Sequence, residues 1–367
     1  MAEPLKNLYS PAFVQSMVLS LKQVFPALNQ KTFVKSVFDS EWDQKELKQR
    51  MKHLAHVLQQ HLHKNYKDDI RTIIEWVHVL RSQSGNQQSF LYLFLAEYVE
   101  IFGQDNVSLS MKAIEEITQY TSCEFAIRPF LIKHPEKVMA YMLKWSTNKN
   151  PNIRRFASEG CRPRLPWGMA IQSFKKDPSL ILPILENLKN DDSEYVRKSV
   201  ANNLNDIAKD NPQIVIDIIK KWKGQTKNTD WIIKHGARTL LKKAHGEALI
   251  LFDLNSNVAC TVRDLKLDKR TLKIGDTLSF SFCLQTDKKR DTKLRIEFGV
   301  YYMKGLGKAS RKLFKITENT FSKDSEIVFN KKISFKDLTT RKHYSGKHKL
   351  SIVVNGTELI EKEFIVE

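Results

Sequence analysis

One eleven-residue segment of the chain gathers the side chains best suited to chemistry. Residues 158–168 read Ser-Glu-Gly-Cys-Arg-Pro-Arg-Leu-Pro-Trp-Gly, which brings together a carboxylate, two guanidiniums, an indole and two prolines. Glu159 follows Arg155 by four residues and precedes Arg162 by three, so the three side chains share one face of a helix. The proline after Arg162 is expected to end that helix, because its ring clashes with the preceding turn. We therefore predict a carboxylate that stays ionised between two arginines, and a stiff loop that carries Trp167.

The elements that must position this segment are helices. Up to about residue 250, apolar residues recur at helical spacing. One such stripe consists of Leu47, Met51, Leu54, Leu58 and Leu62, and a second of Ile70, Ile73, Ile74, Val77 and Leu80. Short breaks at 84–86, 103–105 and 147–151 separate the stripes. The stripes predict a buried core and carry no functional signal.

A repeat is visible in the second part of this helical region. Helices starting at Ile153, Val196 and Ile232 can be superposed with offsets of 43 and 36 residues, near the period of HEAT-type helical pairs. The aligned positions are Arg155, Lys198 and Lys234; Glu159, Asn202 and Arg238; and, on the packing side, Ala157, Val200 and Gly236. Stacked repeats present equivalent positions in a row, so we predict a polar, cationic face. In the last helix Trp231, Lys234, His235 and Arg238 share one side, which suits a sugar-phosphate backbone; a solvated helix face is the alternative.

From about residue 257 the period of the pattern changes to two. Residues 277–284 alternate between polar and apolar side chains after a turn signal at 274–276. Further strands are expected at 294–302, 311–316, 326–335, 349–354 and 358–366, and an Asn-Gly turn at 355–356 joins the last two as a hairpin. About seven short strands predict an immunoglobulin-like sandwich. Its lysine-rich connections at 288–290, 304–315 and 341–349 either contact DNA or are solvated loops of a tethering module.

The charge of the chain favours a polyanionic partner. Lys and Arg number 60 against 41 Asp and Glu, a formal net charge of +19, and most of the excess follows residue 150. A concentrated basic surface favours nucleic acid first and an anionic membrane second. A surface that only promotes solubility would have the same composition, so charge alone does not separate these interpretations.

Several classes of protein lose support from the sequence. The four cysteines form no Cys-x-x-Cys pair, no nucleotide-binding glycine motif occurs, and no apolar run is long enough to cross a bilayer. The N-terminal residues do not resemble a signal peptide, so we expect a reduced, cytoplasmic protein and a monomer, without membrane contact. His53, His56, His61 and His63 crowd one predicted helix, but without a nearby carboxylate we expect no metal there.

The segment at 158–168 resembles the signature of AlkC-type DNA-3-methyladenine glycosylases, relatives of the AlkD-type enzymes built from HEAT-like repeats. The resemblance covers most of the chain and includes an immunoglobulin-like domain found in one branch of the family. It implies base excision repair: hydrolysis of the N-glycosidic bond of cationic bases alkylated at N3, in double-stranded DNA, without base flipping and without a cofactor. The expected fold is mainly α, with a HEAT-like superhelix over residues 1–254 followed by an all-β immunoglobulin-like sandwich over residues 255–367.

The resemblance also assigns roles to residues. Glu159 and Glu124 are expected to stabilise an oxocarbenium-like sugar and to position water, with Asp206 as a third contributor. By spacing alone, Glu124 could cap a helix and Asp206 could be a solvated side chain. The indole of Trp167 either faces the cation or packs under the loop. The residues expected to contact DNA are Arg154, Arg155, Arg162, Arg164, Lys198, Asn202, Trp231, Lys234, His235 and Arg238.

The sequence leaves one rival interpretation: a non-enzymatic HEAT-repeat scaffold that binds DNA. It explains the basic face equally well. It does not explain a carboxylate among arginines on that face, where the carboxylate would repel phosphate, unless Glu159 forms a purely structural ion pair. Some of the arginines are also expected to hold Glu159 rather than DNA, and the sequence does not divide them.

Overall fold

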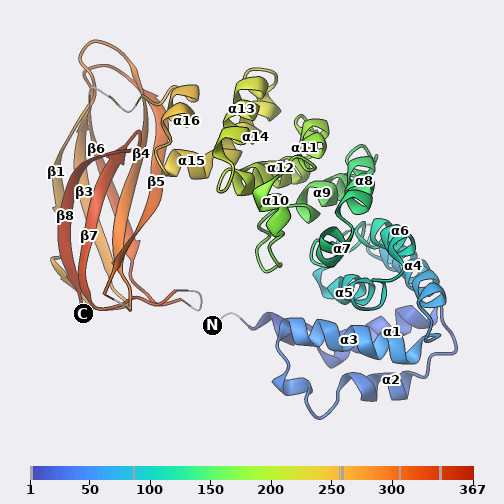
Figure 1. Ribbon diagram of the computed structural model, residues 1–367. Coiled ribbons are helices and arrows are strands. Elements are labelled where there is room, and N and C mark those ends of the chain that lie inside the picture. Colours follow the sequence, from blue (N-terminus) through green and yellow to red (C-terminus); the bar gives the residue numbers. More distant parts are fainter. Residues whose placement is uncertain (1–2, 86, 256, 258–259, 306, 339–340) are drawn as a thin grey trace. The chain divides into compact units, whose positions relative to one another are not determined.

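The computed structural model describes residues 3–85, 87–255, 257, 260–305, 307–338 and 341–367. Helices run from Leu5 to Leu251 and strands from Thr261 to Val366, which confirms the predicted change from a helical region to an all-β region (Figure 1). In chain order the helices are η1 (Leu5–Leu8), α1 (Pro11–Lys22), α2 (Gln30–Val37), η2 (Trp42–Gln44), α3 (Leu47–His61), α4 (Tyr66–Gln83), η3 (Phe90–Tyr92), α5 (Leu93–Phe102), α6 (Val107–Ile117), α7 (Ile127–Lys133), α8 (Pro135–Trp145), α9 (Pro151–Gly160), α10 (Gln172–Lys176), α11 (Leu182–Leu188), α12 (Glu194–Ile207), α13 (Pro212–Trp222), α14 (Lys227–Gly236), α15 (Arg238–Lys242) and α16 (Gly246–Leu251).

The chain forms two compact units whose limits differ from the end of the helices. The first contains Met1–Val215 and Trp222–Gly236, and the second contains Ile216–Lys221 and Ala237–Glu367, so α15 and α16 group with the strands. The predicted division into domains of residues 1–254 and 255–367 stays a prediction. Within the described residues, none of the helices combines the length and apolarity that a membrane crossing requires.

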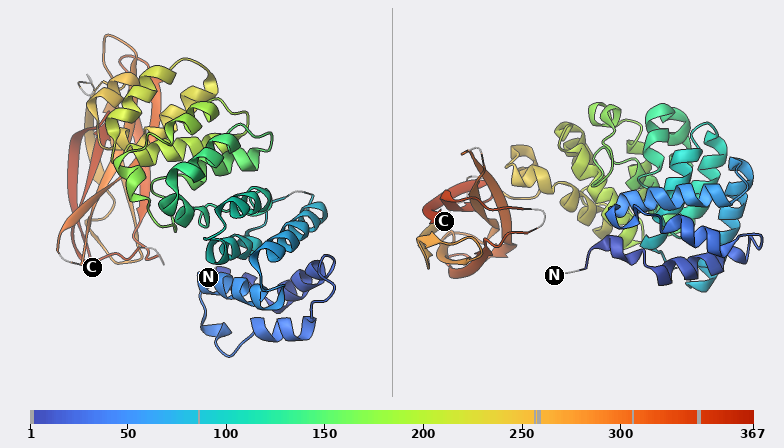
Figure 2. Two further views of the ribbon diagram at one scale, coloured as in Figure 1. Left: turned by 45° about the vertical axis from the view of Figure 1, so that its right-hand side comes forward. Right: turned by 90° about the horizontal axis from the view of Figure 1, so that it is seen from below.

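The apolar stripes form the core of the helical region, as predicted. In α3, Met51, Leu54 and Leu58 are buried, and in α4 the side chains of Ile70 and Val77 are fully covered. Burial of a large aliphatic side chain contributes about 1.5–3 kcal/mol, so these stripes outweigh the weak intrinsic stability of short helices. Neighbouring helices of this unit pack against one another along the chain (Figures 1 and 2).

The three aligned helices pack in sequence, with α12 against both α9 and α14. Ala157 and Val200 are fully buried and Gly236 is buried, so the packing side of the repeat was correctly predicted. Gly236 permits a close approach of α14 to α12, because a Cβ there would lie only 2.9 Å from the Cβ of Leu204.

The last of these helices is shorter than predicted. Helix α14 ends at Gly236, and after the single residue Ala237 (φ −77°, ψ −1°) helix α15 begins at Arg238. Glycine has low helix propensity, and Gly236 is held against Leu204, so the helix ends where packing requires the smallest residue. Arg238 therefore belongs to α15, whereas Lys234 belongs to α14.

A half-buried pair of acidic residues on α5, Glu97 and Glu100, makes the stability of the helical region depend on pH. Burial, reinforced by repulsion from Glu97, raises the pKa of Glu100 from 4.5 to about 7. The folded state favours protonated Glu100. The stability that the protonated group contributes is therefore fully present below the pKa that Glu100 has in the unfolded chain, and it is lost as the pH rises through about 7. We expect Glu100→Gln to raise the free energy of unfolding by about 1–2 kcal/mol at pH 8 and by much less at pH 5. Thermal unfolding at both pH values tests this, with exposed Glu75→Gln as the control; equal shifts at both pH values would contradict it.

The strands form two sheets that share one apolar core. In chain order they are β1 (Thr261–Leu267), β2 (Thr271–Leu272), β3 (Thr277–Gln285), β4 (Thr292–Met303), β5 (Ala309–Phe321), β6 (Glu326–Ser334), β7 (Gly346–Val354) and β8 (Thr357–Val366). The sheet orders are β1-β3-β6 and β2-β8-β7-β4-β5, and Figure 2 shows the sheets face to face. Phe282, Ile296 and Ile352 are among the side chains that fill the space between them. The predicted hairpin is present, with Asn355 and Gly356 at φ 47° and 83°.

Candidate active site

The motif at 158–168 forms the end of α9 and the loop after it. The helix ends at Gly160 with Cys161 as its C-cap, so the helix stop predicted at Pro163 is confirmed within three residues. Ile171 N–H donates to Pro163 O at 3.1 Å and closes the loop. Trp167 has a φ of 64°, in the left-handed region, which costs a non-glycine residue about 1–2 kcal/mol. Lys48 Nζ donates to the carbonyl of Trp167 at 2.5 Å and helps to hold that conformation.

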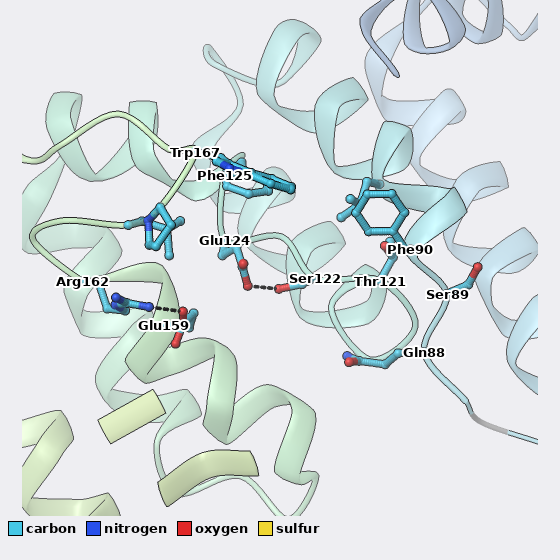
Figure 3. A pocket seen from close by; sticks show the side chains of 13 residues that line it. Gln88, Ser89, Phe90, Thr121, Ser122, Glu124, Phe125, Glu159, Arg162 and Trp167 are labelled. Carbon is cyan, nitrogen blue, oxygen red and sulfur yellow. Dashed lines mark hydrogen bonds and ion pairs between the residues drawn. The ribbon is translucent and has the colours of Figure 1, made fainter. Parts of the chain in front are cut away.

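A cleft of about 530 Å³ opens beside this motif loop (Figure 3). Four parts of the chain line it: residues 88–90 with Leu93, residues 121–125, α9, and the motif loop itself. Glu124, Glu159 and Arg162 supply the charged groups of the wall. Phe90, Phe125 and Trp167 supply aromatic rings, and Trp167 is 69 % exposed.

Glu159 is held from three directions at the wall of this cleft. Arg162 Nη1 donates to its Oε1 at 2.5 Å, and Ser199 Oγ on α12 donates to its Oε2 at 2.6 Å. Arg155 Nη2 lies 3.5 Å from Oε1. The side chain of Glu159 is only 7 % exposed, so its charge depends on these partners rather than on water. The predicted contact between Glu159 and the two arginines is confirmed.

Glu124 joins the same network through Arg155. Ser122 Oγ donates to Glu124 Oε2 at 2.5 Å, and Arg155 Nη1 donates both to that carboxylate oxygen and, at 2.8 Å, to Ser122 Oγ. One guanidinium therefore bridges two glutamates that are 35 residues apart in the sequence. Burial alone would lower the pKa of Arg155, but Glu124 and Glu159 raise it above its ordinary value, so the bridge stays charged.

Asp206 contacts Arg162, the second arginine that holds Glu159, and does not line the cleft. Arg162 Nε donates to Asp206 Oδ2 at 2.8 Å, and Lys209 Nζ donates to Oδ1 at 2.8 Å. Asp206 is 1 % exposed and is not among the residues that line the cleft. Burial opposes the charge of Arg162, but Glu159 and Asp206 together raise its pKa.

Several of the basic residues expected on DNA are engaged by carboxylates. Arg154 pairs with Asp191, with Nε 2.6 Å from Oδ2, and also donates to the carbonyls of Asn148 and Lys149. The remaining pairs are Arg164 with Asp210 at 2.6 Å and Lys198 with Glu194 at 2.7 Å. The Arg164 and Lys198 pairs are more exposed than those of Glu159, and Lys198 keeps 57 % of its side chain in solvent, whereas Asp191, the partner of Arg154, is only 5 % exposed.

The other expected DNA contacts lie on α12, α14 and α15. Trp231 is 40 % exposed and stacks on His235 with ring centroids 5.1 Å apart. Asn202 and Lys234 are partly covered, and Arg238 begins α15. The structure therefore unites Glu124, Glu159, Arg155, Arg162 and Asp206 in one network, with Trp167 at the same cleft, and places the remaining residues outside it.

Arg128 is a structural residue of this site that the sequence did not indicate. Its side chain is fully buried and donates to two backbone carbonyls of the motif and to the one that follows it: Nη1 to Gly160 at 3.1 Å, Nη2 to Arg162 at 2.9 Å and Nε to Met169 at 2.5 Å. Burial lowers its pKa to about 10, so it remains protonated at neutral pH. One guanidinium thus fixes both ends of the motif loop.

We expect Arg128→Met to lower the free energy of unfolding by about 3 kcal/mol. Methionine fills much of the same volume but takes the donor away from three backbone carbonyls, of which those of Gly160 and Arg162 make buried hydrogen bonds. Chemical denaturation measures the effect, and Arg128→Lys, which restores a single donor group, should recover only part of it. A loss below about 0.5 kcal/mol would show that water replaces the guanidinium.

Tyr195 and the two serines were also missed. Tyr195 on α12 places its ring 4.9 Å from the guanidinium of Arg155 and donates its hydroxyl to Gln88 Oε1 at 3.2 Å. Ser122 and Ser199 hold the two glutamates. The only signal for Ser122 is its position two residues before Glu124, and nothing in the sequence pairs Ser199 with Glu159.

The histidines of α3 and the turn after it make separate contacts. His53 Nε2 lies 3.0 Å from two backbone carbonyls, and His61 Nε2 lies 3.0 Å from Ser36 Oγ. His63 contacts Thr72 Oγ1, and His56 packs edge-on against Phe102. In the part of the chain that the structure describes, no group of three His, Cys, Asp or Glu is arranged to hold a metal ion.

Comparisons with known proteins agree with this architecture. The family of DNA alkylation repair enzymes matches residues 58–244, and residues 261–367 match the C-terminal Ig-like domain of the uncharacterised protein YhaZ. The chain is 41 % identical to uncharacterised protein YhaZ of Bacillus subtilis (strain 168) over 352 residues, 96 % of each chain.

A solved structure matches the whole chain. It is alkylpurine DNA glycosylase AlkC of Pseudomonas fluorescens, bound to DNA containing an abasic site analogue; the match covers 100 % of both chains with 32 % identity and a TM-score of 0.92. The predicted fold, helical repeats followed by an Ig-like domain, is thereby confirmed. The chain belongs to the family of DNA alkylation repair enzymes.

Proposed function

We propose that the protein is a monofunctional DNA glycosylase that hydrolyses the N-glycosidic bond of cationic N3-alkylated bases, 3-methyladenine and 3-methylcytosine, in duplex DNA. The observation that carries this proposal is the pair of glutamates at one cleft, Glu124 and Glu159, bridged by the guanidinium of Arg155. The match over its full length to an alkylpurine DNA glycosylase supports it.

In this reaction the base leaves readily, and the difficult part is the stabilisation of the sugar. A base alkylated at N3 carries a positive charge, so when the C1′–N bond breaks its electron pair neutralises the base. The sugar is left as an oxocarbenium-like cation. A water oxygen then bonds to C1′ and releases its proton to solvent. Carboxylates beside the deoxyribose stabilise the cation and orient the water, so no metal or cofactor is required by the reaction.

Within this scheme the two glutamates act directly and their partners position them. Glu159 is fixed by Arg162 and Ser199, and Glu124 by Ser122 and Arg155. Asp206 is separated from the cleft and acts through Arg162, as a positioning residue. Trp167, 69 % exposed at the rim, offers its indole to the cationic sugar or base.

For DNA we propose contact with the phosphates through the more exposed basic residues. Lys198 and Arg164 keep 57 % and 38 % of their side chains exposed, and surface ion pairs of this kind exchange readily for phosphate. Arg155 and Arg162, 13 % and 8 % exposed, hold carboxylates instead. The stacked rings of Trp231 and His235 add an aromatic surface on α14.

We further propose that the lesion stays in the duplex. The sequence shows no cluster of amide and aromatic residues for a flipped base, yet the folded chain does bring Gln88, Phe90, Phe125 and Trp167 to the cleft. A flipped base occupies a snug pocket. Phe90 and Trp167, however, are 40 % and 69 % exposed, which suits an open rim along a groove of DNA. A 2-aminopurine reporter beside the lesion should therefore stay quenched on binding.

Release of free base from methylated duplex DNA tests the main proposal. Wild-type protein is expected to free 3-methyladenine and to leave an abasic site, without strand cleavage. The remaining possibility is a DNA-binding scaffold: that protein would bind the duplex with similar affinity and free no base. We also propose that the protein is a monomer and that it acts on DNA in the cytoplasm. Sedimentation at micromolar concentration tests the oligomeric state directly.

A further inference from the structure

A second cavity lies in the strand-containing unit and shares no residue with the cleft. It measures about 500 Å³ and is bordered by the end of β4, the start of β5 and residues that follow β6. Five cationic side chains line it: Lys304, Arg311, Lys312, Arg341 and Lys342. No carboxylate is among the described residues that line it.

These cations are largely unneutralised. Among the described residues, Arg311 forms the single ion pair of the five, with Glu358 at 2.9 Å. Arg341 lies over the ring of Tyr302, 5.4 Å from its centroid, and this contact aligns the guanidinium without cancelling its charge. Like charges around a concave surface repel one another unless an anion joins them, so the arrangement favours an anionic ligand.

One of the residues that line this cavity is a buried histidine, His343. His343 is only 6 % exposed, yet neither of its ring nitrogens has a hydrogen-bond partner among the residues that the structure describes. Its position is fixed: the backbone N–H donates to Asp337 Oδ1 at 2.8 Å, and the ring packs against Tyr302 and Phe335. Buried polar atoms without partners cost about 1–3 kcal/mol, and a ligand that accepts a hydrogen bond would remove part of that cost.

We propose that this cavity binds a phosphate group. Guanidinium, ammonium, hydroxyl and imidazole N–H groups are the donors that phosphate oxygens accept from, and Arg341, Lys342, Ser310 and His343 supply one of each. Two sources share this chemistry: a phosphodiester of the DNA backbone and the phosphate of a free nucleotide. The proposal does not rest on the glycosylase activity, because binding alone tests it.

The experiment compares two doubly substituted full-length proteins of equal charge. Lys304→Gln/Lys342→Gln removes two exposed cations of the cavity, and Lys331→Gln/Lys332→Gln removes two exposed cations of β6 outside it. The probes are an undamaged duplex of about 20 base pairs, followed by anisotropy from low to high salt, and deoxyadenosine 5′-monophosphate, followed by calorimetry. Two lost phosphate contacts reduce the slope of log affinity against log salt by about 2.

The outcomes separate the sources. A slope reduced by about 2 in the cavity variant, with the β6 variant near the wild type, assigns the site to the DNA backbone. Unchanged duplex binding with lost affinity for the nucleotide assigns it to a free phosphate. Equal behaviour of the two variants toward both probes would overturn the proposal. His343→Phe keeps a ring of similar size and removes the two nitrogens, so it should weaken binding of the same probe about fivefold without lowering the unfolding temperature; wild-type affinity there would count equally against the site.

Discussion

The Glu159→Gln variant is expected to release methylated base from duplex DNA about 100- to 1000-fold more slowly than the wild type. Glutamine has the same length, its oxygen still accepts from Arg162, and its amide can donate to Ser199 Oγ, so the local geometry is kept. What is lost is the negative charge that stabilises the sugar cation. Single-turnover rates with excess protein isolate this chemical step from binding.

Duplex affinity and a matched variant complete that experiment. Glu194→Gln makes the same change at a residue of α12 whose side chain is 64 % exposed, and it should release base at the wild-type rate. Both variants should bind a duplex with an abasic-site analogue within about twofold of the wild type, since neither removes a cation. Undiminished base release by Glu159→Gln would assign the carboxylate a purely structural role and would make Glu124 the remaining candidate at the cleft.

The parts of the site that the sequence predicted are those set by local geometry. The i,i+4 spacing of Arg155 and Glu159 defines their contact in a helix, Arg162 follows two residues after the end of α9 and still reaches Glu159, and a helix cannot continue past Pro163. The change of period from helical to alternating similarly predicted the two regions of the fold, and Asn-Gly predicted the hairpin between β7 and β8.

The parts that it missed depend on how helices far apart in the chain meet. The repeat alignment pairs Glu159 with Asn202, but the residue that contacts Glu159 is Ser199, almost one turn earlier. Alignment identifies equivalent positions, whereas contact depends on the offset at which two packed helices meet. Asp206 was expected to be a third contributor beside Glu159 and Glu124, and it lies instead behind Arg162, outside the lining of the cleft. Arg128 reaches across 32 to 41 residues to backbone carbonyls, which have no sequence signature.

Removal of Arg162 should cause a large loss of stability as well as of activity. Its guanidinium joins Glu159 and Asp206, and its side chain is 8 % exposed. Arg162→Met leaves two buried carboxylates with fewer partners, which typically costs about 3–5 kcal/mol, because the remaining charges are not solvated. Urea denaturation should show this loss as a lower midpoint with an unchanged slope.

The neighbouring arginine provides the matched control for that measurement. Arg164 also makes two hydrogen bonds to one aspartate, Asp210, but its side chain is 38 % exposed, so Arg164→Met should cost no more than about 1 kcal/mol. The cost of Arg162→Met can be tested as an effect of the buried charge that Asp206 keeps after its partner is removed. In that case Asp206→Asn, introduced into Arg162→Met, should raise the free energy of unfolding by about 1–2 kcal/mol, although it removes a further wild-type group. Additive losses in this double variant would instead mean that Lys209 alone neutralises Asp206, and that Arg162 acts on Glu159 only.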